Sequence, residues 1–206
     1  MLNPNKEKPG PRRLDPQVRK HMILDKAAAV VAAEGISAVT MDRVGREAGV
    51  SKPLVYAYFQ NVTTLLQELL LRDQRRLWEL QTIAVSEAKD FDELIRFTTR
   101  TYLKHVEKNG MHIQRLMGEP SVAAVFQERE RESRQRVVEF LAKEIARSFH
   151  VPRDVAILAT EVSMGMTGAA GELISRGVVS RKKVEEIVIC LFKGSVASLR
   201  EQYSKN

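Results

Sequence analysis

The side chains best suited to chemistry lie close together, in residues 40–59. This segment reads TMDRVGREAGVSKPLVYAYF, which is two short helical stretches joined by the four residues AGVS. Gly49 permits a tight backbone turn, Val50 is placed to plug the corner, and Ser51 is a preferred residue type at a helix N-cap. The segment therefore predicts a helix-turn-helix whose second helix begins at Ser51.

The second helix of this pair is expected to present a polar and aromatic face. With Val55 and Phe59 turned toward the core, its outward residues are Lys52, Pro53, Leu54, Tyr56, Ala57 and Tyr58. In a helix-turn-helix this helix enters the major groove of DNA. There the lysine can donate to guanine, the small apolar residues can contact thymine methyl groups, and the tyrosine hydroxyls can donate to phosphates. Two outward tyrosines on a short helix favour DNA binding over a turn with a structural role alone.

Further phosphate contacts are expected on both sides of this helix. Thr40, Arg43 and Arg46 precede it, and Asn61 follows it as the predicted N-cap of the next helix. Residues 1–14 are rich in proline and basic residues, which predicts a flexible basic arm. Basic side chains that can reach more phosphates or a minor groove are Arg12, Arg13, Arg19 and Lys20.

Composition limits the possible classes of protein. The chain of 206 residues carries 33 Lys and Arg against 26 Asp and Glu, a net charge of +7 that favours a polyanionic partner. No apolar run is long enough to span a membrane, and no apolar signal core precedes Arg13. The single cysteine, Cys190, excludes an internal disulfide and is expected in the core. We therefore expect a cytoplasmic protein.

The hydrophobic periodicity predicts an all-α fold, because no segment alternates apolar and polar residues as a strand would. Gly45 stands inside a predicted helix, where glycine costs about 1 kcal/mol relative to alanine, so we expect the two motif helices to cross closely there. The predicted domains are the arm, residues 1–14, a DNA-binding domain, 15–62, and a ligand-binding and dimerisation domain, 63–206. The nine expected helices cover about 15–34, 40–48, 51–59, 61–81, 90–108, 112–117, 121–149, 154–176 and 180–203.

The N-terminal quarter resembles the TetR family of bacterial regulators over about residues 19–70. The resemblance is carried by Ile23-Leu24-Asp25-Lys26-Ala27-Ala28, Glu34-Gly35, Thr40-Met41, Val44-Gly45-Arg46-Glu47-Ala48-Gly49-Val50-Ser51-Lys52 and Val55-Tyr56-Ala57-Tyr58-Phe59. It implies an Ω-shaped all-α dimer in which three N-terminal helices bind DNA, later helices enclose a ligand pocket, and the last two long helices form the dimer. Members of this family are mostly repressors that a ligand releases from DNA.

The resemblance also implies which residues contact DNA. The family's recurrent contact positions fall here on Thr40, Arg43, Ser51, Lys52, Leu54, Tyr56 and Tyr58. The family often carries a lysine directly after the cap of the fourth helix, but Val62 stands at that position in this chain. That phosphate contact is therefore either missing or replaced by Asn61, by Thr63 or by the helix N-terminus.

A ligand pocket is expected among the later helices. Large, adaptable apolar side chains and polar side chains on apolar faces are its candidate lining. The alternative is that the apolar residues belong to the core and that Glu161 is solvated. The candidate residues are Trp78, Phe97, Thr101, Tyr102, His105, Met117, Phe126, Glu161 and Met164.

The last two helices, about residues 154–176 and 180–203, are the candidate homodimer interface. Gly165, Gly168 and Gly171 weaken the first of them unless another helix approaches closely. The second carries more apolar surface than one neighbour needs, from Val184 to Leu199. We expect both to pair with their symmetry mates in a four-helix bundle, the alternative being a core within one chain.

These features predict a dimeric repressor that binds a palindromic double-stranded DNA operator and is released by a small, largely apolar effector. No nucleophile–base pair, metal-ligand pattern or phosphate-binding loop is present in the sequence, so no catalytic residue, metal or cofactor is expected. Two alternatives stay open, namely a ligand-sensing helical module without DNA binding and a helical-bundle enzyme.

Overall fold

A computed structural model describes residues 15–203, except that the side chains of residues 126–132 are left undescribed. The predicted arm, residues 1–14, lies outside the described residues, and so does the Phe126 side chain. The described chain is all-α, as predicted. Its elements are α1 (Pro16–Glu34), the 3₁₀ helix η1 (Ile36–Ala38), α2 (Met41–Glu47), α3 (Lys52–Tyr58), α4 (Val62–Glu87), α5 (Phe91–Met117), α6 (Pro120–Phe149), α7 (Arg153–Ser175) and α8 (Arg181–Tyr203).

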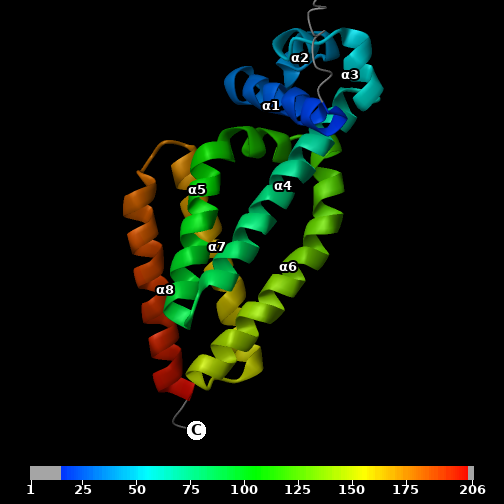
Figure 1. Ribbon diagram of the computed structural model, residues 1–206. Coiled ribbons are helices and arrows are strands. Elements are labelled where there is room, and N and C mark those ends of the chain that lie inside the picture. The colour runs from blue at the N-terminus through cyan, green and yellow to red at the C-terminus, as the bar shows by residue number, and fades with distance from the viewer. Residues whose placement is uncertain (1–14, 204–206) are drawn as a thin grey trace, which may run out of the picture.

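The helices form two parts that differ in helix length (Figure 1). The N-terminal helices α1 to α3, residues 16–58, which we call the head, lie together at one end of the molecule. Helices α4 to α8 form an elongated bundle below them. Within the bundle α5 is central, since it contacts α4, α6, α7 and α8 and also α1 of the head. Movement of α5 or α4 therefore reaches the head directly.

Side-chain caps define where several helices begin. Asp15 accepts from the backbone N–H of Gln17, Thr40 Oγ1 accepts from that of Arg43 at 3.1 Å, and Asn61 Oδ1 accepts from that of Thr64 at 2.8 Å. Each bond satisfies a donor that the first turn leaves unpaired. Ser51 occupies the predicted N-cap position of α3, but its side chain makes no cap bond, so the position of the cap is confirmed and the side-chain bond is not.

Two predicted helix ends are wrong, because α4 runs past Gln81 to Glu87 and α5 runs past Lys108 to Met117. The dipeptide Asn109-Gly110 was expected to end a helix, but α5 continues through it to Met117. A Cβ built on Gly110 would lie 2.9 Å from Cβ of Ser175, so the glycine allows α7 to pack closely against α5. Within residues 15–203 the helices still total nine, because the short 3₁₀ helix η1 follows α1.

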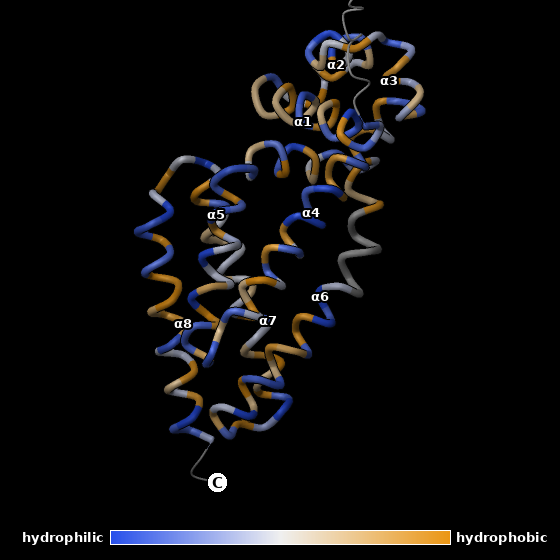
Figure 2. The backbone as a smooth tube through the Cα atoms, viewed as in Figure 1, coloured by the Kyte–Doolittle hydropathy of each residue, from blue (hydrophilic) through white to orange (hydrophobic). Residues whose placement is uncertain are grey.

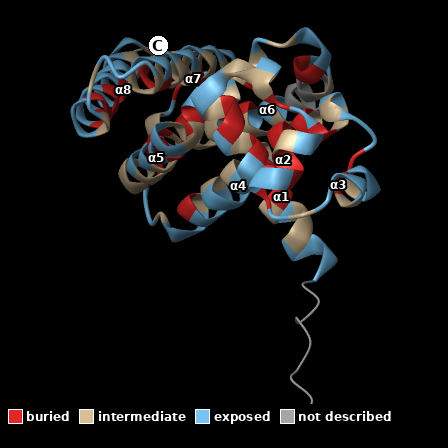
Figure 3. Cartoon of the chain, turned by 90° about the horizontal axis from the view of Figure 1, so that it is seen from above, coloured by how far each residue is buried: buried red, intermediate tan, exposed pale blue. Residues whose placement is uncertain are grey.

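The head does not have a separate core. Buried apolar side chains of α1, α2 and α3 form one cluster with the first turns of α4, from Leu65 to Leu70, and with Leu116 at the end of α5. In Figure 3 buried residues cluster where α1 and α2 lie against the other helices, whereas α3 stands at the edge. The head is thus held to the bundle by shared hydrophobic packing.

Close packing of α2 on α3 confirms the prediction made from Gly45. A Cβ built on this glycine would lie 3.0 Å from the backbone oxygen of Val50 and 3.2 Å from Cγ2 of Val55. Gly49 adopts a φ of 65°, the left-handed backbone conformation that the turn requires. The two glycines therefore serve different purposes, one allowing the helices to cross and the other allowing the chain to reverse.

Candidate nucleic-acid interface

Helix α3 presents its outer face to solvent. Val55 and Phe59 are completely buried, as the pattern predicted, and they anchor α3 and the residue that follows it in the head core. On the opposite face Lys52, Pro53 and Tyr56 are exposed, with 49% of Tyr56 accessible. An accessible lysine and tyrosine on the second helix of a helix-turn-helix can reach bases and phosphates without any rearrangement of the fold.

Tyr58 is placed differently from Tyr56. It is half-buried and packs against the head core, with its ring centroid 6.4 Å from that of Phe59. Because Tyr58 follows Val55 by three residues, helical geometry turns it partly inward. The expectation that both tyrosines point outward therefore holds in full only for Tyr56, and Leu54 is likewise half-buried.

The two arginines of α2 differ in how they are engaged. Arg43 donates to Glu47 Oε1 and to Glu34 Oε1, each at 2.9 Å, so its guanidinium already has carboxylate partners. Arg46 is exposed, and no described carboxylate lies within ion-pair distance of it. Arg46 can therefore bind a phosphate directly, whereas Arg43 must exchange its partners to do so. Thr40 is exposed, and its hydroxyl oxygen serves as the cap of α2.

The first turn of α4 lies beside this surface without a lysine. Asn61 is exposed, and its side-chain oxygen caps α4. Its side-chain amide N–H groups can therefore donate to another acceptor. Thr63 is exposed next to it, and Val62 is half-buried against the head core. The helix N-terminus, the Asn61 amide and Thr63 can together supply donors for a phosphate in place of the missing lysine.

The predicted ligand-lining residues are dispersed. Thr101 and His105 line a groove between the bundle and α1, but no other predicted residue does so. Met117 packs against the head core, and Glu161 is half-exposed and paired with Arg134 at 2.5 Å, as its solvated alternative predicted. Trp78, Phe97, Tyr102 and Met164 are half-buried within the bundle.

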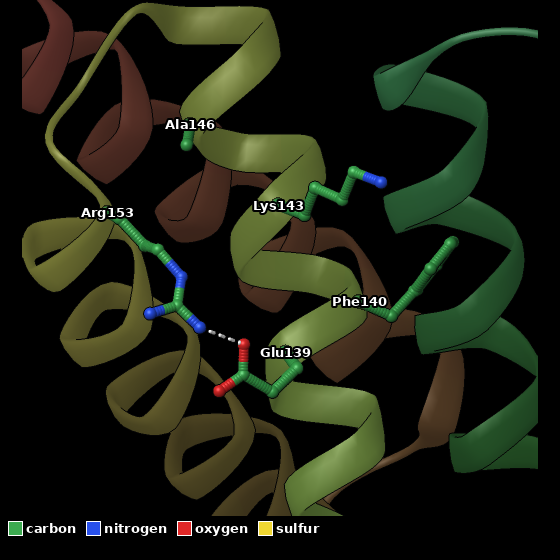
Figure 4. Close-up of a pocket in the computed structure, with 5 residues that line it drawn as sticks. All are labelled: Glu139, Phe140, Lys143, Ala146 and Arg153. Atoms are coloured by element: carbon green, nitrogen blue, oxygen red, sulfur yellow. Dashed lines mark hydrogen bonds and ion pairs between the residues drawn. The ribbon is translucent and has the colours of Figure 1, made fainter.

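A second depression lies on the outer surface, far along α6 (Figure 4). It has a volume of about 420 Å³ and includes Phe140, Lys143 and Ala146 of α6. An ion pair of 2.5 Å between Arg153 and Glu139 crosses it from α7 to α6. None of the predicted ligand-lining residues belongs to it.

A buried ionic network joins the head to the bundle, and sequence reasoning missed it. Asp73 of α4, whose side chain is 3% exposed, binds His112 Nε2 of α5 at 2.5 Å and Arg72 Nε at 3.2 Å. Arg72 then donates to Asp25 Oδ1 at 2.7 Å and to the backbone oxygen of His21, both on α1. The signal that could have revealed it is a pair of charged residues on the otherwise leucine-rich inner face of α4.

The pKa of Asp73 is lower than that of an ordinary aspartate. Burial raises the pKa, but the hydrogen bond with His112 and the charge of Arg72 outweigh burial. The carboxylate is therefore ionised at neutral pH, and an ionised buried carboxylate requires both of its partners. His112 and Arg72 thus hold α4 in a fixed relation to α5 and α1.

Two further polar contacts fasten α1 to the bundle. Lys20 pairs with Glu68 of α4 at 3.2 Å. Arg115 of α5 donates to the backbone oxygens of Val31 and Ala32, at 2.5 Å and 2.9 Å, in the last turn of α1, where the Val31 oxygen also accepts from the backbone N–H of Gly35. Helix α1 is therefore held at its start, middle and end.

The sequence of the head matches a known family of proteins. A family model described as bacterial regulatory proteins, tetR family, matches residues 23–69, from α1 into α4. The HTH-type transcriptional regulator SrpR of Pseudomonas putida is 25% identical over 111 residues, 48% of this chain. That alignment covers 52% of SrpR, about half of its length.

Solved structures match the whole fold. A TetR-like transcriptional regulator from Rhodococcus sp. RHA1 superposes with a TM-score of 0.71 at 23% identity, covering 90% of this chain and 99% of that one. SCO4454, a TetR-family transcriptional regulator from Streptomyces coelicolor, gives a TM-score of 0.69 at 18% identity, covering 89% and 97%.

The motif, the all-α bundle and these matches define a helix-turn-helix head on a TetR-like fold. Residues 23–69 thus match the tetR family of bacterial regulatory proteins, and the fold as a whole resembles solved TetR-family structures. Within the described residues, no helix combines the length and the apolar character needed to cross a membrane.

Stability should depend on pH through His105, which is buried next to the network. Burial lowers its pKa below the ordinary value of 6.5, so below that pH the unfolded chain binds a proton that the folded chain does not. We predict that the unfolding free energy falls as the pH drops from 7 toward 5, by at most about 1.4 kcal/mol per pH unit from this group. In H105Q, urea unfolding should show a weaker dependence on pH over the same range.

The variant H21Q is the control for this measurement, because it removes an imidazole from the exposed side of α1. It should keep the pH dependence of the wild type at the same protein concentration. If H105Q and the wild type lose stability in parallel, the buried imidazole is not the group that titrates.

Proposed function

We propose that the protein regulates transcription by binding a palindromic DNA operator as a homodimer. The observation that carries the proposal is the solvent-facing surface of α3, where Lys52 and Tyr56 are exposed while Val55 fixes the helix from behind. Two heads related by a two-fold axis would place their α3 helices in successive major grooves, about 34 Å apart. In this arrangement Lys52 reads bases, and Tyr56, Arg46 and Asn61 bind phosphates.

The dimer is proposed to form through α7 and α8. Leu158 and Val162 are 67% and 73% exposed on α7, one turn apart, and Ile187 and Leu191 are 48% and 52% exposed on α8 with the same spacing. Figure 2 shows hydrophobic segments recurring along α8, one of the outer helices of the bundle. Apolar side chains this accessible, repeated on adjacent helices, are typical of a surface that a second copy covers.

Glycines on α7 support the same arrangement. A Cβ built on Gly165 or Gly168 would meet no atom of this chain within 4 Å, so neither glycine is required by packing inside the monomer. A helix of the partner subunit can approach the α7 backbone closely there. Cys190, which was expected in the core, is exposed on α8 between Ile187 and Leu191. We propose that the partner subunit covers Cys190 in the dimer.

A small-molecule effector is proposed to control the distance between the heads. Helix α4 contacts α1 in the head and both α5 and α6 in the bundle, so it belongs to the two proposed domains at once. A ligand that prefers one position of α4 and α5 would shift the population of head spacings away from the one that fits DNA. The protein would then act as a repressor in the cytoplasm, released by its effector.

The DNA-binding role of α3 is tested by alanine substitutions. We predict that K52A and Y56A each lower operator affinity by more than tenfold in a gel-shift titration, because each removes a direct contact from the exposed face of α3. The operator is obtained first by sequencing the genomic fragments that the purified protein retains. K182A, which removes an exposed lysine from α8, is the control and should bind as the wild type does. Wild-type affinity in both α3 variants would exclude these residues from the interface.

The dimer is tested at Val162. We predict that V162D converts the dimer to a monomer in sedimentation velocity at micromolar concentration, because it places a charge in the middle of an apolar interface. V18D makes the same change at a valine of α1 that is 49% exposed, and it should remain a dimer. A dimer in both variants would mean that α7 does not form the interface.

A further inference from the structure

A groove of about 850 Å³ separates the head from the bundle. One side is α1, the second is α4 and the third is one face of α5. The part formed by α1 consists of Ala28, Ala29 and Ala32, whose small side chains leave the groove open where larger residues would fill it. It lies against α1 on the side of the bundle, and α2 and α3 lie beyond α1 (Figure 1). It is therefore separate from the DNA-reading face.

Positive charge is concentrated at this groove. Lys104 and Lys108 stand one turn apart on α5 and are exposed, and in the described part of the chain no carboxylate pairs with either. Arg76 faces them from α4 with 47% of its side chain exposed, and its nearest carboxylate oxygens are 3.7 Å and 3.9 Å away. These distances are long for an ion pair, so Arg76 retains capacity for another anion.

The acidic residues of the groove are already engaged. Asp25 accepts from Arg72 at 2.7 Å, and Asp73 lies behind the groove between Arg72 and His112. The charges of Lys104 and Lys108 are therefore not balanced within the groove. A cleft with unbalanced charge of one sign on a low-dielectric protein wall concentrates ligands of the opposite sign.

A neutral imidazole adds a hydrogen-bond donor. Asn109 Nδ2 lies 3.3 Å from His105 Nδ1, and because an amide nitrogen can only donate, Nδ1 must accept. Burial lowers the pKa of His105, which keeps the ring neutral at pH 7 and places its proton on Nε2. The groove thus offers three cationic side chains and donors that suit phosphoryl or carboxylate oxygens.

We propose that this groove binds a small polyanion, a molecule with a phosphoryl group or at least two carboxylates, between Lys104, Lys108 and Arg76. The lining disfavours a metal ion, which would meet three positive charges, and an apolar effector, which would desolvate them. This site goes beyond the proposed function, since it is distinct from the DNA-reading face and takes a charged ligand, whereas the proposed effector is largely apolar; of the predicted ligand-lining residues, Thr101 and His105 belong to it. Helix α1 forms one side of the groove, so an anion bound there contacts the head and the bundle together.

The test uses the full-length protein and isothermal titration calorimetry, with pyrophosphate and citrate as probes in separate titrations. We expect at least one of them to bind saturably with one site per chain. In the double variant K104A/K108A that affinity should fall about tenfold or more, because two of the three cations are removed. The matched control K182A/K183A removes two exposed lysines of α8, and it should bind as the wild type does.

The results of these titrations either support the anion site or overturn it. Binding lost in K104A/K108A and kept in K182A/K183A supports the site, with the thermal unfolding midpoints of both variants confirming that they fold. Saturable binding of neither probe to the wild type, or equal binding by the wild type and K104A/K108A, would overturn it. No DNA is used in this experiment, so its failure is distinct from failure of the proposed operator binding.

Discussion

The relation between the head and the bundle depends on one buried carboxylate, that of Asp73. It is almost inaccessible, and its low pKa requires both His112 and Arg72 to stay in place. A buried charge that loses a partner costs on the order of 3–5 kcal/mol, which is a large part of the stability of a typical domain. Through Arg72 the constraint extends to Asp25 and the backbone of α1. Three helices are therefore positioned by one ionic network.

The constraint matters because the head is small and has no core of its own. Its hydrophobic cluster continues into α4 and to the end of α5, and Arg115 caps the last turn of α1 from α5. Hydrophobic packing is not directional, whereas an ion pair fixes an angle. The head thus takes its orientation from polar contacts with the bundle, and the proposed control of two heads on DNA requires such contacts.

The groove beside the network and the proposed dimer face lie on different sides of this junction. One is lined by α1, α4 and α5, and the other is formed by α7 and α8, which contact α5 from the bundle. Helix α5 is common to both. A change in the position of α5 would therefore reach both the proposed dimer face and the head, without a separate relay element.

Sequence reasoning was strongest where the signal is local. The cap at Asn61, the inward residues Val55 and Phe59, and the close crossing at Gly45 follow from short-range backbone chemistry and helical periodicity. The continuation of α5 through Gly110 was not predictable in this way, because the glycine is explained by its contact with Ser175, which is distant in sequence.

The candidate sites show the same limit. Outward placement was predicted for Tyr58 because Val55 and Phe59 were assigned to the core, but its position three residues after Val55 turns it partly inward. Exposure of Cys190 could not be inferred from apolar neighbours, because an apolar run on α8 can face a second chain as well as its own core. Asp73 and His112 lie 39 residues apart, and nothing in the spacing along the chain indicates that they meet.

The most direct test of this account is hydrogen exchange in D73N, which keeps the shape of the side chain and removes its charge. The account predicts that the amides of α1, Pro16–Glu34, exchange at least about tenfold faster relative to those of α7, Arg153–Ser175, than in the wild type. An unchanged ratio between the two helices would contradict it, because the head would then be held without the buried carboxylate.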